Sequence, residues 1–200
     1  MAGGDGEAPL LAPPGYRAGW LLYAHRPRGP LPRRWRGLVG YGRLDIAARF
    51  MLAALYPGGL LIGDSFMLLF LDGGGGEGEA LLFEPACLPG EMHEEEEAAR
   101  LLLDALRGGR CRRGPASLRG LLLSARRRGY RVVALREGGG EPRAGDGGYL
   151  FLVGSRVDPP TGVPVDEVWG LGCFPYLAST VAAYINLVRV LAAERGRDDG

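Results

Sequence analysis

The stretch from residue 149 to residue 191 constrains the fold of this chain more than any other. It holds two short apolar pieces, 149–153 and 167–172, and each one ends at or contains glycine. A helix with one buried face should follow, because apolar residues then recur at a spacing of three and four. These residues are Leu177, Val181, Tyr184, Ile185, Val188 and Leu191. The stretch therefore predicts strand, loop, strand, loop and helix.

Both glycine-containing loops leave the carboxyl end of a predicted strand. α/β proteins bind their ligands at this edge of the sheet, and glycine lets the backbone approach a ligand closely. Glycine is also common in ordinary tight turns that bind no ligand. A ligand-binding edge and plain turns are therefore the two interpretations of these glycines.

Apolar runs and helical patterns alternate along most of the 200 residues. Further strands are predicted at 20–24, 65–71, 80–84 and 130–135. Further helices are predicted at 42–55, 93–106 and 117–128. This alternation is typical of an α/β fold with a mostly parallel sheet and helices on both faces.

The two ends of the chain differ from the rest in composition. Residues 1–18 are rich in glycine, alanine and proline, and we expect them to form a disordered tail. Residues 194–200 are mostly charged, and we expect disorder there too. Residues 19–195 show no repeat and no strong boundary, which predicts a single domain.

The three cysteines, Cys87, Cys111 and Cys173, lie far apart in the sequence. Because there is no CxxC pair and no His/Cys cluster, we expect free thiols and no metal site. No apolar run approaches the roughly 20 residues that span a membrane. The N-terminus also lacks a basic-then-apolar signal pattern. The sequence therefore predicts a cytoplasmic protein with no membrane segment.

All 24 basic residues are arginine, and five of them fall in the short segment 26–36. This segment also holds Trp35 and three prolines, which disfavour regular structure. Arginine suits phosphates and tryptophan suits an unstacked base, so RNA binding is one interpretation. A solvated surface loop is the other, and composition does not separate the two.

The predicted helix at 42–55 begins with two charged residues, Arg43 and Asp45. Asp45 in the first turn complements the helix dipole, which is a sufficient structural reason for its presence. Arg43 lies at the positive end of the same dipole, which is electrostatically unfavourable. We therefore expect Arg43 to have an external partner.

Common nucleotide and hydrolase motifs are absent, since no GxGxxG follows the first strand and no P-loop, GxSxG or HExxH occurs. Four other features, in order, resemble the SPOUT class of trefoil-knotted RNA methyltransferases. Within that class the chain is most similar to the archaeal tRNA pseudouridine-54 N1-methyltransferase family, TrmY. The features are Ala24-His25-Arg26 after the first strand, Gly42-Arg43-Leu44-Asp45 with Arg49, an Asp64-led strand with an acidic-start helix ending Asp104-Ala105-Leu106, and the segments 151–154, 171–172 and 176–179.

The resemblance implies S-adenosylmethionine as the cofactor and N1-methylation of pseudouridine in the T-loop of tRNA. It also implies a C-terminal trefoil knot, RNA as a partner and a homodimer that packs through the terminal helix. Asp45 would accept or orient the proton of the base, and Arg43 would hold the base or a phosphate. Cys173-Phe174-Pro175 replaces the family's Pro-Leu-Ser, and Ser155 replaces an acid. Methylation of ribosomal RNA and a non-catalytic RNA-binding protein are therefore the alternatives.

The same resemblance assigns two further sets of residues. The cofactor-binding set is Leu135, Val153, Gly154, Ser155, Leu171, Gly172, Phe174, Tyr176 and Leu177. The RNA-binding set is Arg26, Arg28, Arg33, Arg34, Trp35, Arg36 and Arg49.

Overall fold

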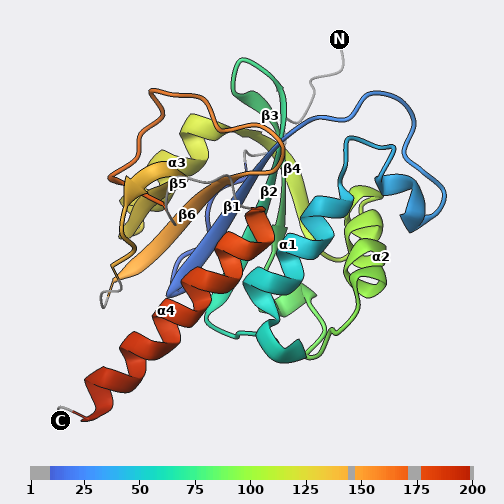
Figure 1. The fold of residues 1–200 in the computed structure, drawn as a ribbon. Coiled ribbons are helices and arrows are strands. Elements are labelled where there is room, and N and C mark those ends of the chain that lie inside the picture. Colours follow the sequence, from blue (N-terminus) through green and yellow to red (C-terminus); the bar gives the residue numbers. More distant parts are fainter. Residues whose placement is uncertain (1–9, 144–146, 171–176, 199–200) are drawn as a thin grey trace.

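The computed structural model describes residues 10–143, 147–170 and 177–198, with residues 191–198 described by their backbone alone. In these ranges seven strands form one sheet, in the order β4-β3-β2-β1-β6-β5-β7 (Figure 1). The strands are β1 (Ala18–His25), β2 (Ser65–Gly74), β3 (Glu77–Phe83), β4 (Arg112–Ser117), β5 (Tyr130–Gly140), β6 (Gly148–Gly154) and β7 (Glu167–Trp169). The α-helices are α1 (Asp45–Leu55), α2 (Glu95–Leu106), α3 (Leu118–Arg127) and α4 (Ala178–Asp198).

Five neighbouring strands, β2, β1, β6, β5 and β7, run parallel to one another, and β3 and β4 pair antiparallel at one edge. The predicted mostly parallel α/β sheet is therefore confirmed. Strand β1 lies in the middle, with Ala18 in register with Ser65 of β2 and with Tyr149 of β6. Seven of its eight residues are buried, as expected for a strand covered on both faces.

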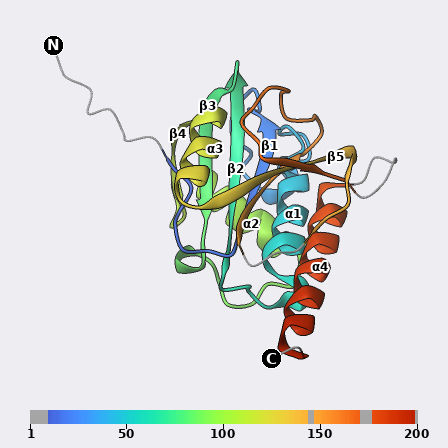
Figure 2. The same ribbon diagram turned by 90° about the vertical axis from the view of Figure 1, so that its left-hand side faces the viewer.

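Helices cover both faces of the sheet, as predicted (Figure 2). Helices α1, α2 and α4 pack on one face, where Trp20 and Leu22 of β1 share a core with Phe50 of α1. Helix α3 packs on the other face, over Leu21 and Tyr23 of β1. Alternate residues of β1 thus enter opposite cores, which is the side-chain period of a strand.

Strand β4 is missing from the sequence-based prediction, because its residues show no apolar alternation. It forms at the edge of the sheet, where it pairs only with β3. An edge position tolerates Pro115, which has no N–H to donate to a second neighbour. Strand β5 also continues beyond the predicted end at residue 135, to Gly140.

Described parts of both predicted disordered tails, residues 10–18 and 194–198, have a defined structure. From Leu10 onward the N-terminal segment packs beside α3: Leu10 and Ala12 are buried, and the Ala12 N–H donates to Ser124 Oγ at 3.2 Å. Helix α4 extends to Asp198, through most of the segment predicted to be disordered. Leu10 and Ala12 pack into the core, but the glycines and prolines around them give this segment the composition of a disordered tail.

The prediction of free thiols is wrong for Cys87 and Cys111, which form a disulfide with Cα atoms 5.2 Å apart. Both residues are buried. The bond links the turn after β3 to the segment that enters β4, and these strands pair side by side. Sheet pairing therefore brings together two cysteines that the sequence separates by 24 positions.

Removing this disulfide should destabilise the fold. A cross-link across a loop of this length reduces the entropy of the unfolded chain by an amount equivalent to about 3 kcal/mol. A Cys111→Ser variant should therefore lose about 3 kcal/mol of unfolding free energy, measured by urea denaturation. Cys87→Ser is the matched comparison and should lose a similar amount, because either substitution breaks the same bond. An unchanged urea midpoint for Cys111→Ser would contradict the pairing.

Candidate active site

The carboxyl ends of the parallel strands and the first turns of α1 and α4 lie at the same edge of the sheet (Figure 1). The loop after β6 begins here, where the Ser155 N–H donates to the Tyr23 carbonyl oxygen of β1 at 2.9 Å. The Arg26 N–H donates to the Asp72 carbonyl oxygen of β2 at 2.8 Å. Because ligands of α/β proteins bind at this edge, it is the candidate site.

Asp45 is the centre of a charged cluster at this edge. It is the first residue of α1 and is only 5% exposed. Arg43 donates through Nε and Nη2 to the two carboxylate oxygens at 2.9 and 3.0 Å, and Arg49 Nη2 donates to Oδ2 at 2.8 Å. Arg49 Nε also lies 3.0 Å from Glu95 Oε1 of α2. The cluster therefore joins the start of α1 to the start of α2.

Arg43 has a left-handed backbone, with φ of 59°, and is alone in this among the non-glycine residues of the described ranges. Such a backbone costs on the order of 1 kcal/mol or more in an L-residue. The bidentate contact with Asp45, two residues along the chain, accompanies it. Within the described residues the Arg43 guanidinium pairs with Asp45 of the same segment, and the expected external partner of Arg43 stays a prediction.

The pKa of Asp45 lies below the ordinary value for aspartate. Burial raises this pKa, but the hydrogen bond and charge of Arg43 and the charge of Arg49 together outweigh burial. Asp45 is therefore ionised at neutral pH and is a weak base. Its geometry suits accepting a hydrogen bond and holding two arginines better than storing a proton.

The predicted cofactor-binding residues fall into two groups. Leu135, Val153, Gly154, Ser155 and Leu177 are described, whereas Leu171, Gly172, Phe174 and Tyr176 lie outside the described residues. Leu135 and Val153 are buried in the neighbouring strands β5 and β6, and Gly154 ends β6. Leu177 is 69% exposed, just before α4 begins. The fold thus brings the described members to one edge of the sheet.

The glycines in these loops allow close packing of the backbone. A Cβ atom at Gly154 would lie 2.3 Å from the Val157 carbonyl oxygen, and one at Gly170 would lie 2.6 Å from the Arg136 carbonyl oxygen. A side chain at either position would therefore push apart two segments of main chain. For these two glycines the described contacts support the plain-turn interpretation.

Arg136 fastens the loop after β6 to the end of β5. Its Nη2 donates to the carbonyl oxygens of Pro159 and Pro160, each at 3.1 Å. Its Nε is buried and has no hydrogen-bond partner among the described residues. Unpaired buried donors are uncommon in folded proteins. This one lies between the end of β5 and the loop after β6.

The predicted RNA-binding residues also divide into two groups. The arginines of segment 26–36 are exposed, and partly buried Trp35 begins a short 3-10 helix, η1 (Trp35–Leu38). Arg49 instead belongs to the Asp45 cluster, where it contacts two carboxylates. The basic segment thus forms an outer surface, and Arg49 forms part of the inner cluster.

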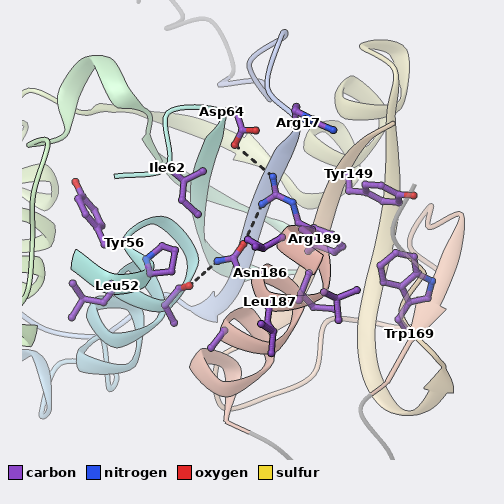
Figure 3. Close-up of a pocket in the computed structure, with 18 of the residues that line it drawn as sticks. Arg17, Leu52, Tyr56, Ile62, Asp64, Tyr149, Trp169, Asn186, Leu187 and Arg189 are labelled. Carbon is purple, nitrogen blue, oxygen red and sulfur yellow. Dashed lines mark hydrogen bonds and ion pairs between the residues drawn. The ribbon is translucent and has the colours of Figure 1, made fainter. Parts of the chain in front are cut away.

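A groove of about 880 Å³ opens at the opposite edge of the sheet, where β1, β2 and β6 begin (Figure 3). Its walls are mostly apolar and come from α1, α4, β6 and β7, with Arg17 and Asp64 among its polar residues. The described members of the predicted cofactor-binding set are not among its lining residues. Sequence reasoning missed this groove.

Two polar residues of α4 connect the groove to its surroundings. Asn186 Nδ2 donates to the carbonyl oxygens of Ala53 and Ala54 at the end of α1, at 2.9 and 3.1 Å. Arg189 Nη1 donates to Asn186 Oδ1 at 3.1 Å, and its Nη2 lies 3.5 Å from Asp64 Oδ1. Burial lowers the pKa of Arg189, and Asp64 acts in the opposite direction. An asparagine and an arginine inside an apolar helical pattern were the available sequence signal.

The described residues contain neither a membrane-spanning helix nor a metal-binding group of side chains. None of the helices in residues 10–143, 147–170 and 177–198 is both long and apolar enough to cross a bilayer. The same residues contain no group of three His, Cys, Asp or Glu side chains placed to hold a metal ion. The cytoplasmic location expected from the sequence stays a prediction.

Comparison with known proteins yields a structural relative. No family model and no curated protein matches the sequence. The structure is similar to that of Archaeoglobus fulgidus Nep1 bound to S-adenosylhomocysteine, with a TM-score of 0.54 and 15% identity. The match covers 86% of this chain and 96% of that chain. At this identity the likeness shows a shared fold and does not single out the TrmY family.

Acid should remove the stabilising contribution of Asp45. Because its pKa in the folded state lies below the unfolded value of about 3.9, the contribution is complete above that pH and is lost as the pH falls through the folded-state pKa. At pH 7 an Asp45→Asn variant should be about 1–3 kcal/mol less stable than the unaltered protein. This gap should shrink steadily below about pH 4. Urea denaturation across a pH series measures it, and a gap independent of pH would count against the ion-pair cluster.

Proposed function

We propose that this protein is an S-adenosylmethionine-dependent RNA methyltransferase that modifies N1 of pseudouridine in the T-loop of tRNA. The observation that carries the proposal is Asp45, a buried carboxylate held by two arginines at the edge where the predicted cofactor loops converge. The fold shared with a protein bound to S-adenosylhomocysteine supports it. The ordered motifs that resemble TrmY give the pseudouridine part of the proposal.

The residues at the carboxyl ends of β5 and β6 fit this cofactor. Leu135 and Val153 provide apolar surface, and the backbone of Gly154 and Ser155 provides polar groups at the end of a strand. The proposed set is completed by Leu171, Gly172, Phe174, Tyr176 and Leu177. When bound, S-adenosylmethionine supplies an electrophilic methyl group on its sulfonium.

Asp45 acts in this proposal as an orienting acceptor. N1 of pseudouridine carries a proton that must leave as the methyl group arrives. A carboxylate with a lowered pKa accepts a hydrogen bond from this N–H and increases electron density on the nitrogen, and water then takes the proton. Arg43 uses two of its five N–H donors on Asp45. Its other donors suit a base carbonyl or a phosphate.

A homodimer that packs through α4 is part of the proposal. Helix α4 buries Ala178, Ala182 and Ile185 in the core of its own chain. Leu177, Tyr184, Leu187 and Val190 are exposed, so the predicted buried face is only partly buried. Leu187 and Val190 also line the groove of Figure 3. An apolar stripe beside an apolar groove suits a self-complementary contact about a two-fold axis.

Transfer of labelled methyl from S-adenosylmethionine tests the reaction on matched tRNAs with uridine or pseudouridine in the T-loop. We expect label on the pseudouridine form only. Asp45→Asn should lower the rate at least about 100-fold and leave cofactor binding unchanged. Asp166→Asn is the matched control, because Asp166 also pairs with an arginine but lies at the amino end of β7. It should keep a rate within about threefold of the unaltered protein.

The alternatives predict other results in the same experiment. Cofactor binding without label on either tRNA would favour ribosomal RNA as the substrate. If the unaltered protein does not bind S-adenosylmethionine, a non-catalytic RNA-binding protein is favoured. In that case Asp45→Asn should change stability only.

Placing a charge at Leu187 should separate the dimer. Leu187 is 54% exposed within its own chain, so Leu187→Glu should change the stability of a monomer by less than about 0.5 kcal/mol. Light scattering after gel filtration should give a dimer for the unaltered protein and a monomer for the variant. Val39→Glu, at an equally exposed apolar residue outside α4, should remain dimeric. A monomeric unaltered protein would refute this part of the proposal.

A further inference from the structure

A second cleft, of about 620 Å³, lies between the basic segment and α2. One wall is formed by residues 33–36 and the other by the exposed side of α2 and the residue after it. The lining residues are Arg33, Arg34, Trp35, Arg36, Glu96, Arg100, Leu103, Asp104 and Arg107. In Figure 1 the segment after β1 passes beside α2, which is how two regions distant in sequence come to share a cleft.

The cleft carries an excess of positive charge. Five arginines and two carboxylates line it, which leaves three positive charges in excess. Arg100 forms an ion pair with Glu96 one turn earlier on α2. The remaining arginines of the lining come from the basic segment, except Arg107. A basic cleft of this size suits a phosphodiester group together with a flat ring.

The segment that forms the cleft is held in place. Arg107 Nη2 donates to the carbonyl oxygens of Pro32 and Arg33, at 3.0 and 2.9 Å. The guanidinium carbon of Arg36 lies 5.3 Å from the centre of the Trp35 ring, within range of a cation–π contact. The Trp35 ring is partly buried against the main core. The backbone of residues 32–33, the Trp35 ring and the Arg36 guanidinium therefore have fixed contacts before any ligand arrives.

The cleft is also fixed relative to Asp45. The Leu44 N–H donates to the Leu38 carbonyl oxygen of η1 at 3.1 Å, and Tyr41 N–H donates to Gly37 at 3.0 Å. Asp45 follows directly after Leu44. Hydrogen bonds thus tie the cleft wall to the segment that leads directly into Asp45.

We propose that this cleft is a second RNA subsite that takes one unstacked nucleotide next to the target base. The inference rests on the proposed function and deepens it. Trp35 provides the stacking surface for the base, and the arginines of both walls contact the adjacent phosphates. Arg100 and Arg107 of the α2 wall are thereby added to the RNA-binding residues, with Arg107 also positioning the basic segment.

Equilibrium binding of a T-arm hairpin RNA and of a fully paired RNA duplex tests the stacking part. Trp35→Ala should weaken hairpin binding roughly 5- to 100-fold and duplex binding less than about twofold, because a duplex offers no unstacked base. Trp35→Phe keeps an aromatic ring and should bind the hairpin within about threefold of the unaltered protein. Equal loss for hairpin and duplex, or no loss for either, would overturn the proposal.

The salt dependence of hairpin binding tests the role of Arg107. Arg107→Ala removes a charge and also releases the segment 32–33. One lost phosphate contact lowers the slope of log K against log salt by about 0.7. Because further contacts of the released segment are lost too, the slope should fall by more than this. Arg110→Ala is the matched control, an exposed arginine beyond the same helix and outside the cleft. Equal slopes for the two variants would overturn the positioning role.

These measurements are independent of methyl transfer. If the unaltered protein binds the hairpin and the Trp35 variants behave as expected, the subsite stands even when no methyl group is transferred. If methyl transfer proceeds and the Trp35 and Arg107 variants bind like the unaltered protein, the proposed function stands and the subsite does not.

Discussion

Strand β1 is paired in parallel on both sides, with β2 and with β6, and the other elements take their positions from this double pairing. A strand so placed has neighbours along both edges and is buried on both faces, so helices must cover the sheet from two sides. Parallel pairing also brings the carboxyl ends of β1 and β6 together. The chain leaving β1 reaches Asp45, and the chain leaving β6 forms a predicted cofactor loop. This pairing therefore places Asp45 and the start of the loop after β6 at the same edge of the sheet.

Around this site arginine side chains bond loop carbonyl groups and also supply the proposed RNA contacts. Arg107 and Arg136 each donate to two successive carbonyl oxygens, at 32–33 and at 159–160, in loops that contain proline. Proline has no N–H, so such loops form few hydrogen bonds of their own and leave carbonyl groups to be satisfied from elsewhere. The planar fork of arginine reaches both carbonyls, which a lysine ammonium does less well. Arginine therefore holds these loops in place, in addition to the RNA contacts proposed for it.

The sequence predicted the parts of this structure that depend on local patterns. Apolar runs and helical spacing located the main strands and helices, and the GRLD segment located Asp45 and Arg43. It could not locate features that depend on sheet pairing: edge strand β4, the disulfide between Cys87 and Cys111, and the burial of Leu10. The pairing of Arg43 with Asp45 depends on a left-handed backbone, which residue type does not reveal. The second cleft requires α2 beside the basic segment, and only the fold brings them together.

The side-chain amide of Asn186 links the last helix, α4, to the first, α1. The final carbonyl groups of α1 have no partners within their own helix, and this amide from α4 bonds two of them, at Ala53 and Ala54. Helix α4 begins next to the predicted cofactor loop, and α1 begins at Asp45. The contact joins the middle of α4 to the carboxyl end of α1. A change in the angle between α4 and α1 would have to break these two hydrogen bonds, so they help to fix the helix that begins at Asp45 against the helix that begins after Leu177.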